Sequence, residues 1–411
     1  MSASFFQQQY STQVASTFLG SKSIFTPRIP EKVAPVIGEF YQVQFKEAGA
    51  YTPSESAFTL HSEPPYNGNL LGEVWLKFTV SAITDVTTPF AAGAGDVMCF
   101  HDDLAYAAIE EIRLVDGGEV VERVKMREEH LRQCYEDIDE RRNTLDLRGW
   151  YGSEAACNAA ARSAKTYYVK LPFEFCKDYF KYLRLIALRS NQLSFELKMA
   201  PKSEWTYASG FTPVFTFTDY VLWIEYFTLG QSELSALMSR SLSYPYKMIE
   251  TLSEMTVSHT TGTDTTSDLE IPFLHPVSCI YVLTQASDHN SYRKKFYSEP
   301  DTAVSKGGIK ADGKWRWEEM DSVWWMKIYP ARVAYRADNN LLVFPATYAM
   351  NNPTETGFLD CSKLQNVYLR HRIASARGTA TFKVLVFAQV PNVFTYTTVG
   401  SGTKIRSLYD R

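Results

Sequence analysis

Residues 166–199 read TYYVKLPFEFCKDYFKYLRLIALRSNQLSFELKM, and this stretch decides the fold class of the chain. Apolar side chains occupy every second position from Tyr167 to Phe175, which is the spacing of a strand with one buried face. After a short stretch of helical spacing, Leu193 to Met199 again alternates between apolar and polar residues. Two half-buried strands so close together predict an all-β protein, and nothing in the stretch has the residues of a reaction centre.

Composition agrees with a β-rich core of more than one domain. The 411 residues include 25 Phe, 25 Tyr and 8 Trp, and aromatic side chains pack well on pleated sheets. A chain of this length accommodates about two or three domains that each bury a core. The formal net charge is −4, from 42 Lys and Arg against 46 Asp and Glu. That balance argues against a protein whose main task is to coat nucleic acid.

The sequence predicts neither secretion nor a membrane span. No stretch approaches the roughly 18 to 20 uncharged apolar residues of a transmembrane helix, and residues 1–13 carry neither an early positive charge nor an apolar core. Six cysteines are scattered without a close pair: Cys99, Cys134, Cys157, Cys176, Cys279 and Cys361. We therefore expect reduced, packed thiols and a protein that is made and assembled inside a cell.

Strand patterns fill most of the chain and fall into two series. The first series begins at 70–80 and ends with the apolar region 211–229, and the second runs from 248–258 to 379–390. Two all-β units are the simplest model for this order. We predict an N-terminal arm at 1–38, a first unit at 39–229, a linker helix at 230–246, a second unit at 247–396 and a C-terminal tail at 397–411.

Two segments are predicted to interrupt the strands as helices. In the linker, Ser232 is positioned to cap a helix whose apolar face contains Leu234, Leu237 and Met238, and Pro245 would stop that helix. In 126–141, apolar residues recur at three- and four-residue intervals among many charges. We interpret those charges as a solvated helix face with pairs four residues apart.

Turns and loops are predicted where glycine and polar residues gather. Asp116-Gly117-Gly118 predicts a tight hairpin turn, because glycine adopts the positive φ that such turns require. The polar stretches 260–268 and 298–322 predict loops, and 323–328 predicts a strand.

Taken in order, these landmarks resemble the major capsid proteins of the double jelly-roll lineage, which large DNA viruses of eukaryotes, virophages and polinton-like viruses share. The resemblance spans about residues 70 to 405 and is carried by 108–130, 166–199, 220–254, the His-Pro-Val strand at 275–277, and the closing strands at 357–369 and 384–402. The arm matches this pattern poorly, and 140–165 and 298–322 have no clear counterpart in it.

The resemblance implies two tandem eight-stranded jelly-roll β-sandwiches with short connecting helices. It also implies a non-enzymatic major capsid protein of the virion, assembled in the host cytoplasm or nucleus as homotrimeric, pseudo-hexagonal capsomers that tile an icosahedral shell. The implied partners are neighbouring capsomers, penton and minor or cement capsid proteins, and an inner membrane. No cofactor and no specific nucleic-acid recognition are implied.

A search for catalytic, cofactor-binding and metal-binding patterns identifies no candidate residues. The seven histidines are far apart and form neither HExxH nor a Cys/His zinc spacing. His101-Asp102-Asp103 comes nearest to a metal cluster, but three adjacent residues do not easily face one ion, so we expect a polar loop there. His275 is interpreted as a structural histidine, and 93–96 lacks the third glycine of a dinucleotide fingerprint.

One tryptophan-rich segment supports an alternative function. It contains four tryptophans with carboxylates between them: Trp315, Trp317, Trp324, Trp325, Glu318, Glu319 and Asp321. Exposed tryptophans can stack on a sugar ring, and carboxylates beside them can hydrolyse a glycosidic bond. The alternative is therefore a carbohydrate-active double β-sandwich, either a lectin or a glycan hydrolase.

We favour a structural interpretation of these tryptophans. Trp324 and Trp325 would begin a strand with one ring facing the core, while Trp315 and Trp317 would pack a loop or a neighbouring subunit. The loop 298–322 would then form an outward tower that presents Trp315 and Trp317 to partners. A cytosolic scaffold or minor capsid component is a third interpretation, which differs in copy number and self-assembly.

Overall fold

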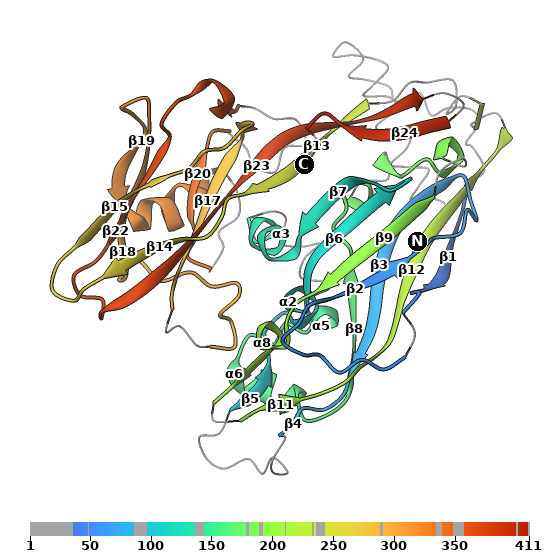
Figure 1. Ribbon diagram of the computed structural model, residues 1–411, viewed down its shortest axis with the longest axis horizontal. Coiled ribbons are helices and arrows are strands. Elements are labelled where there is room, and N and C mark those ends of the chain that lie inside the picture. The colour runs from blue at the N-terminus through green and yellow to red at the C-terminus, as the bar shows by residue number, and fades with distance from the viewer. Residues whose placement is uncertain are drawn as a thin grey trace, which may run out of the picture.

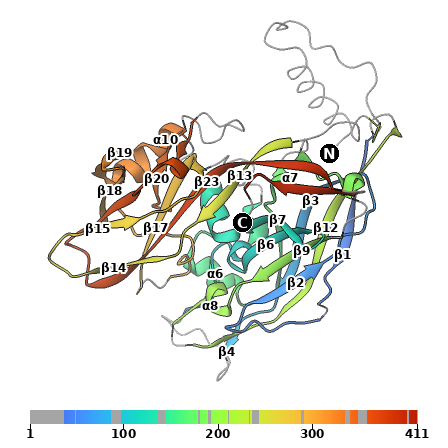
Figure 2. The same ribbon diagram turned by 45° about the horizontal axis from the view of Figure 1, so that its top comes forward.

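Two β-sandwiches lie side by side in this computed structural model (Figure 1, and turned by 45° in Figure 2). The structure describes residues 36–47, 49–85, 97–135, 144–177, 181–188, 192–209, 211–231, 234–235, 243–287, 291–333, 339–347, 357–399 and 402–409. Within these residues, no helix combines the length and apolar character that crossing a membrane requires.

The first sandwich consists of two four-stranded antiparallel sheets with the strand orders β1–β12–β3–β8 and β2–β9–β6–β7. Its strands are β1 (Val36–Gln44), β2 (Phe58–Ser62), β3 (Leu70–Val80), β6 (Ile109–Asp116), β7 (Glu119–Lys125), β8 (Lys165–Lys170), β9 (Leu193–Met199) and β12 (Phe217–Leu229). Two short ribbons, β4 (Thr84–Asp85) with β11 (Pro213–Val214) and β5 (Met98–Phe100) with β10 (Thr206–Ala208), extend it at one end.

The second sandwich repeats the same strand order. Its sheets are β13–β23–β17–β20 and β15–β22–β18–β19, and β14 and β24 also pair with the long strand β23. The bounds are β13 (Ser243–Thr251), β14 (Met255–His259), β15 (Thr265–Glu270), β17 (Cys279–Ala286), β18 (Val304–Ala311), β19 (Lys314–Asp321), β20 (Leu342–Pro345), β22 (Tyr368–Ile373), β23 (Ala380–Val399) and β24 (Gly402–Ser407). A small ribbon joins β16 (Pro276–Val277) to β21 (Leu359–Asp360).

This order identifies both sandwiches as jelly rolls. Numbering the eight principal strands of either sandwich along the chain gives sheets in the order 1–8–3–6 and 2–7–4–5, so strands distant in sequence pair within each sheet. Two four-stranded sheets that face each other in this arrangement form the jelly roll. The predicted fold class, a double jelly roll with short helices, is confirmed.

Short helices fill the connections between strands. They are α2 (Leu104–Ala107), α3 (Met126–Gln133), α5 (Leu145–Arg148), α6 (Glu154–Ala160), α7 (Glu174–Lys177), η3 (Leu185–Leu188), α8 (Lys202–Trp205), the π-helical turn η4 (Trp324–Ile328), α10 (Pro330–Val333) and η5 (Cys361–Lys363). The longest of them, α3, lies between the two sandwiches (Figure 1).

Side-chain alternation explains why β3 and β9 pack as predicted. In β3, Val74, Leu76 and Phe78 are fully buried while the residues between them are half-exposed, and β9 follows the same alternation. One apolar face per strand is what a sheet needs when only one side covers a core. The hairpin between β6 and β7 is also confirmed, with positive φ at Gly117 and Gly118.

In the second sandwich, β17 is buried on both faces. Ile280 and Val282 point into the second core, whereas Tyr281 and Leu283 pack in the core cluster of the first sandwich. Their register partners on β23 divide in the same way. The apolar run that the sequence shows in this strand therefore covers two cores at once, and it joins the sandwiches into one packed body.

The structure corrects several local predictions. The stretch 298–322 is mostly the β18–β19 hairpin rather than a loop, closed by Asp312 and Gly313, which both have positive φ. Residues 324–328 form the π-helical turn η4 rather than a strand. Part of 260–268 belongs to β15. The strands β15, β18 and β19 were missed because their exposed polar residues and glycines resemble a loop. The turn η4 was predicted as a strand because its sequence is rich in apolar residues.

The opening stretch is corrected only at its centre. The strand predicted from Tyr167 to Phe175 ends at Lys170, and α7 begins at Glu174. Pro172 removes a backbone donor at this point, which agrees with the end of pairing. Phe173 and Phe175 are nevertheless buried, as their apolar spacing predicted.

The linker and the two ends of the chain are described only in part. Leu237 and Met238 lie outside the described residues, and so do residues 1–35 of the arm. Strand β13 begins at Ser243, so Pro245 lies within a strand rather than stopping a helix. Strand β24 pairs with residues 394–399 of β23, and this ribbon reaches η3 of the first sandwich, where the Tyr396 hydroxyl accepts the backbone N–H of Arg184 at 3.2 Å.

Candidate functional site: the junction between the two sandwiches

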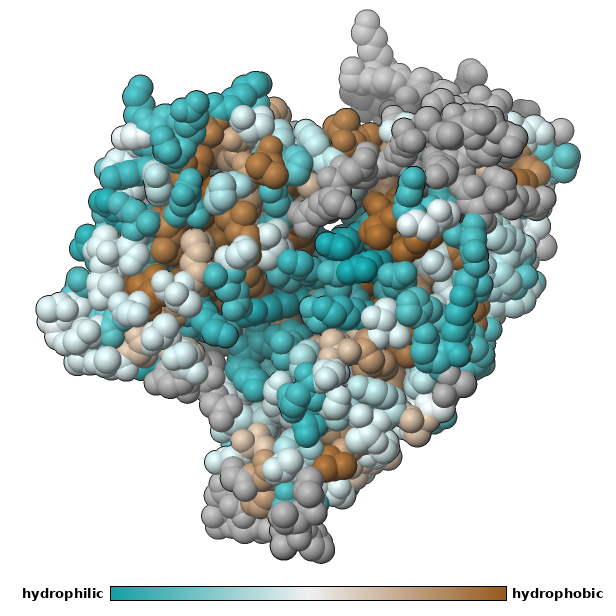
Figure 3. Space-filling view, viewed as in Figure 1, coloured by the Kyte–Doolittle hydropathy of each residue, from teal (hydrophilic) through white to brown (hydrophobic). Residues whose placement is uncertain are grey.

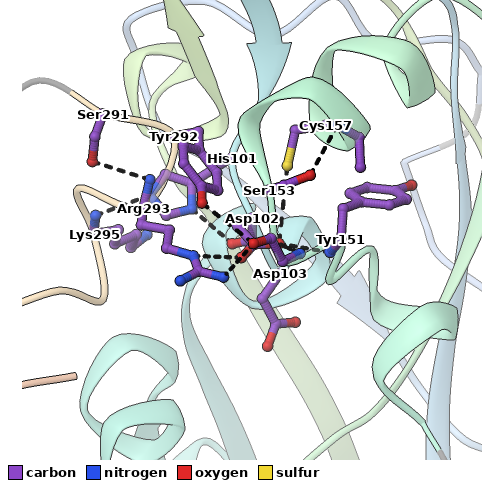
Figure 4. A network of polar contacts seen from close by, with 12 residues as sticks. His101, Asp102, Asp103, Tyr151, Ser153, Cys157, Ser291, Tyr292, Arg293 and Lys295 are labelled. Atoms are coloured by element: carbon purple, nitrogen blue, oxygen red, sulfur yellow. Dashed lines mark hydrogen bonds and ion pairs between the residues drawn. The ribbon is translucent and has the colours of Figure 1, made fainter. Parts of the chain in front are cut away.

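A segment of the second sandwich, residues 291–298 between β17 and β18, inserts into the first sandwich. Its Arg293 side chain reaches Asp102, with Nε donating to Oδ2 at 2.9 Å, and also donates to the carbonyl oxygen of Gly152 at 3.0 Å (Figure 4). The other oxygen of Asp102 accepts the backbone N–H of Tyr151 at 2.7 Å. The buried carboxylate therefore has partners from both sandwiches.

His101 completes this contact in a fixed neutral form. The backbone N–H of Lys295 donates to Nε2 at 2.9 Å, so Nε2 carries no proton and Nδ1 donates to the carbonyl oxygen of Asp102 at 2.8 Å. Burial, together with Lys295 and Lys294, lowers the pKa of His101 to about 3. Both ring nitrogens are occupied, so the ring serves as a structural link between the sandwiches and not as a base or a metal ligand.

The side chain of Lys295 is itself buried at the junction. Its Nζ donates to the carbonyl oxygen of Ala107 at 2.8 Å and pairs with Glu204 at 2.5 Å, both in the first sandwich. Burial lowers the pKa of Lys295 below its ordinary value. A buried ammonium group needs such partners, because leaving it unpaired costs several kcal/mol.

Asp103 turns away from this contact and organises the first sandwich. It has a left-handed backbone with φ of 58° and points its carboxylate toward His130 and Arg148, each at 3.1 Å (Figure 4 shows it directed away from Arg293). The ring of His130 in turn lies 4.1 Å from that of Phe296 in the inserted segment. Residues 101–103 form the predicted polar loop, between β5 and α2, but His101, Asp102 and Asp103 are all buried in it.

Helix α3 forms the second half of the junction. At its start, Arg127 donates to Gln285 at 2.9 Å and to Glu254 at 3.2 Å, both in the second sandwich. Just after its end, the Tyr135 hydroxyl donates to Asn339 at 2.9 Å, and the Tyr135 ring lies 5.9 Å from that of Tyr281. The helix therefore bridges the first sandwich to the outward face of β17.

In α3, Glu128, Glu129 and Arg132 are buried, which corrects the predicted solvated face over the described residues, while 136–141 of the predicted helix lie outside them. Glu129 and Arg132 form a paired contact at 2.7 Å, and Lys177 joins them at 3.1 Å. Burial favours the neutral acid, but Arg132 and Lys177 outweigh it and hold the pKa of Glu129 well below its usual range. This burial could not be predicted from periodicity, because the spacing of apolar residues does not reveal which neighbouring element covers a helix.

A further buried acid lies beside this network on β7. Glu122 accepts the backbone N–H of Glu174 at 2.8 Å, and its other oxygen has no hydrogen-bond partner among the described residues. Burial raises the pKa of Glu122 to about 8, despite the opposing backbone hydrogen bond. A small cavity at this place is lined from both sandwiches, by residues that include Glu122, Lys177, Met248 and Tyr409.

The two tryptophans singled out from the sequence lie on opposite faces of β19. Residues 310 and 315 pair across the hairpin, as do 309 and 317, so Arg316 is an extra residue in a bulge. Trp317 points inward, packs against the second core and donates to the carbonyl oxygen of Pro345 at 3.3 Å. Trp315 points outward and is 37% exposed. They therefore do not form a shared platform for a sugar.

Trp315 is also held against the sheet by its neighbours. Lys310 and Arg370 lie 4.4 Å and 5.7 Å from the centre of its ring. A Cβ atom at Gly308 would come within 2.9 Å of the indole, so the absence of a side chain there makes room for the ring. Trp325 is buried and donates to the carbonyl oxygen of Gly307 at 2.8 Å, while Trp324 is half-buried.

The junction attaches the two sandwiches to each other. Arg293, His101, Lys295 and Arg127 each have a partner across it, and in the described part of the chain no group of His, Cys, Asp and Glu is placed to hold a metal ion. Hydrophilic residues gather where the two sandwiches meet on the face shown in Figure 3, so the buried contacts have a polar rim. The inserted residues 291–298 escaped prediction, although a cationic SYRKKF sequence between strands was a usable signal.

Comparisons with known proteins agree on one class. Residues 52–228 match the family model described as the major capsid protein N-terminus. PBCV-1 VP54, in a crystal structure fitted into a reconstruction of the virophage Sputnik, has a TM-score of 0.71 at 13% identity, over 95% of this chain and 100% of that one. No curated protein sequence matches the chain.

Two further capsid proteins share the fold. The Faustovirus major capsid protein has a TM-score of 0.64 at 9% identity, over 88% of this chain and 91% of that one. The mavirus major capsid protein has a TM-score of 0.52 at 11% identity, over 90% of each chain. Both of these proteins are named as major capsid proteins. Residues 52–228 thus match the major capsid protein N-terminus family, and nearly the whole chain has the same fold as these viral capsid proteins.

Proposed function

We propose that this chain forms homotrimeric, pseudo-hexagonal capsomers that tile an icosahedral virus shell. The observation that carries the proposal is the duplication of one strand order in two sandwiches that a buried junction holds together. Three such chains around a threefold axis would present six sandwiches of one topology, which gives a nearly hexagonal tile.

The junction supports this proposal because a tile needs a fixed angle between its parts. Domains that meet over modest polar interfaces usually move relative to each other. Here the outward face of β17 shares a core with the first sandwich, and ion pairs such as that of Arg293 with the buried Asp102 fix the register. A rigid pair of sandwiches repeats the same contact angles in every capsomer.

The remaining parts of the proposal concern the edges of this tile. The chain divides into an arm at 1–38, a first sandwich at 39–229, a linker at 230–246, a second sandwich at 247–396 and a tail at 397–411. Trp315, on the outward face of β19, contacts a partner outside the capsomer. Neighbouring capsomers, penton proteins, minor or cement proteins and an inner membrane complete the set of partners.

Solution mass tests the capsomer directly. The purified chain is measured by light scattering on a sizing column and then imaged in negative stain. We expect a stable species of three times 46.7 kDa with a pseudo-hexagonal outline. A monomer that persists at every concentration tested would contradict the proposal, and a dimer or an open filament would contradict the threefold arrangement.

A further inference from the structure

We infer that the outward face of the β1–β12–β3–β8 sheet is the surface that receives a second copy of this chain, and that the second copy contacts it with the region around η4. This inference rests on the proposed capsomer and names the seam within it. It follows from the contact that already joins the two sandwiches inside one chain.

Inside the chain, the contact pairs a sheet face with the helix that follows the fifth strand of a sandwich. Strand β7 is the fifth principal strand of the first sandwich, and α3 begins directly after it at Met126. That helix and its neighbours cover the outward face of the β13–β23–β17–β20 sheet, where Tyr281, Leu283 and Phe387 are buried. The contact between α3 and this sheet thus shows one way in which two such sandwiches pack against each other.

The equivalent sheet face of the first sandwich is covered at one end, where Tyr182 stacks on the buried Phe227, and is half-exposed around its two tryptophans. Trp75 and Trp223 are direct register partners on this outward face, and both remain half-exposed. Phe40 on the neighbouring edge strand β1 is 51% exposed and pairs with Glu225. Outward faces of antiparallel sandwiches are ordinarily polar. This row of aromatic side chains differs from that rule, and aromatic side chains are enriched at protein–protein interfaces.

The indole nitrogens of the two tryptophans on this face differ in their hydrogen bonding. The Nε1 donor of Trp223 is buried without a hydrogen-bond acceptor among the described residues. The indole of Trp75 by contrast donates to Glu73 at 2.9 Å.

The matching contact region lies after the fifth strand of the second sandwich. Strand β19 is the equivalent of β7, and η4 follows it as α3 follows β7. Here the apolar side chains are exposed, with Val323 at 38% and Ile328 at 45%. The region that would act like α3 therefore has an apolar surface with nothing packed on it in the described chain.

The two surfaces lie at opposite ends of the molecule. Strand β1 is at the far right of Figure 1, and β19 is at the far left. A contact between different surfaces of identical chains is heterologous, and it forms a ring when the rotation closes. Repeating the contact found inside the chain between chains gives a ring in which all six sandwich contacts have one geometry.

Glutamate substitutions on each surface test the seam. Phe40→Glu and Ile328→Glu each place a charge in the inferred contact, while Leu274→Glu is the matched control on a residue that is 71% exposed elsewhere in the second sandwich. We expect the two seam variants to be monomers at a concentration at which the parent and the control are trimers. Circular dichroism and unfolding curves verify that all three variants are folded.

Mixing the two seam variants distinguishes a heterologous seam from a symmetric one. Each variant retains one intact surface, so an equimolar mixture is expected to form a dimer of one copy of each variant and no ring. Trimers of Phe40→Glu or Ile328→Glu that are as stable as the parent would overturn the seam and leave the capsomer proposal standing. A parent that never assembles would overturn both.

Discussion

The two sandwiches share one strand order but differ in what covers their equivalent sheets. In the second sandwich, both faces of β17 are buried, and the strand reads as a nearly continuous apolar run. In the first sandwich the equivalent strand, β3, alternates, with Trp75 and its neighbours half-exposed on the outward side. The comparison shows that the two sandwiches share one topology, whereas the polarity of each outward face depends on what packs against it.

The distribution of buried charge differs as well. Around the junction the first sandwich buries Asp102, Asp103, Glu122, Glu129 and Arg132, whereas a prominent ion pair of the second sandwich, Asp268 with Arg370, lies at the surface. Buried pairs add little net stability over apolar contacts, but removing one partner is costly. The charges therefore make the junction specific for one arrangement of the two sandwiches.

The largest expected effect comes from removing a side chain that only the junction buries. Tyr281→Ala should cost about 4 kcal/mol, because it empties the space between β17 and α3. It should also split thermal unfolding into two transitions, since the shared core then no longer couples the sandwiches. Scanning calorimetry measures both effects.

The neighbouring residue is the control for this experiment. Val282 points into the second core, so Val282→Ala should cost about 2 kcal/mol and leave the coupling between sandwiches unchanged. If Tyr281→Ala unfolds in one transition with an unchanged midpoint, the shared core does not couple the two sandwiches.

The next effect separates an ion pair with a buried carboxylate from one with an exposed carboxylate. Asp102→Asn removes the charge opposite Arg293 and should cost about 3 kcal/mol in urea unfolding. Asp268→Asn removes an exposed partner of Arg370 and should cost less than about 1 kcal/mol. Equal losses in the two variants would show that the junction pair contributes no more than a surface pair.

A smaller effect depends on pH through Glu122. Because burial raises the pKa of Glu122 to about 8, the folded state keeps its proton in a range where the unfolded chain has lost it. The folded state then binds more protons, so stability falls as pH rises toward 8. From about pH 6 to about pH 7.5, the loss attributable to this group should be about 2 kcal/mol.

Glu122→Gln isolates this contribution because it removes the titration and retains the shape. The difference in unfolding free energy between the variant and the parent should therefore grow in favour of the variant over that pH range. Parallel pH curves for the two proteins would mean that Glu122 is ionised in the folded state.

The smallest effect concerns the bulge that places two tryptophans on opposite faces. Trp315→Ala should change stability by about 1 kcal/mol or less, because its ring is partly exposed and held by Lys310 and Arg370. Trp317→Ala should cost about 2 kcal/mol, because its ring packs on the second core. Equal losses would contradict opposite placement of the two rings.

Sequence patterns correctly located strands with one apolar face, and they failed for strands that combine glycines with a charged outward face. Strand β3 was predicted with its observed bounds, because alternation and a single core agree. The β18–β19 hairpin was missed, because Gly307, Gly308 and the charged outward face of β19 resemble a loop. Asp312-Gly313 was nevertheless a hairpin signal of the kind correctly used at Gly117-Gly118.

The junction was missed for a different reason. His101, Asp102 and the charges of α3 are ordinary surface residues by type, and only the arrival of residues 291–298 from the other sandwich makes them buried. Partners nearly two hundred positions apart leave no local pattern, because alternation and helical spacing report only on nearest neighbours along the chain.

By itself, the sequence determined the class of fold, the order of most strands and the resemblance to double jelly-roll capsid proteins. These follow from apolar spacing and turn residues, which act over a few positions. Only the tertiary structure decided which faces are covered, which charges are buried and how the two sandwiches are joined. Those properties depend on contacts between segments distant in sequence, where burial changes the energy of a charge or an aromatic ring without changing the residue.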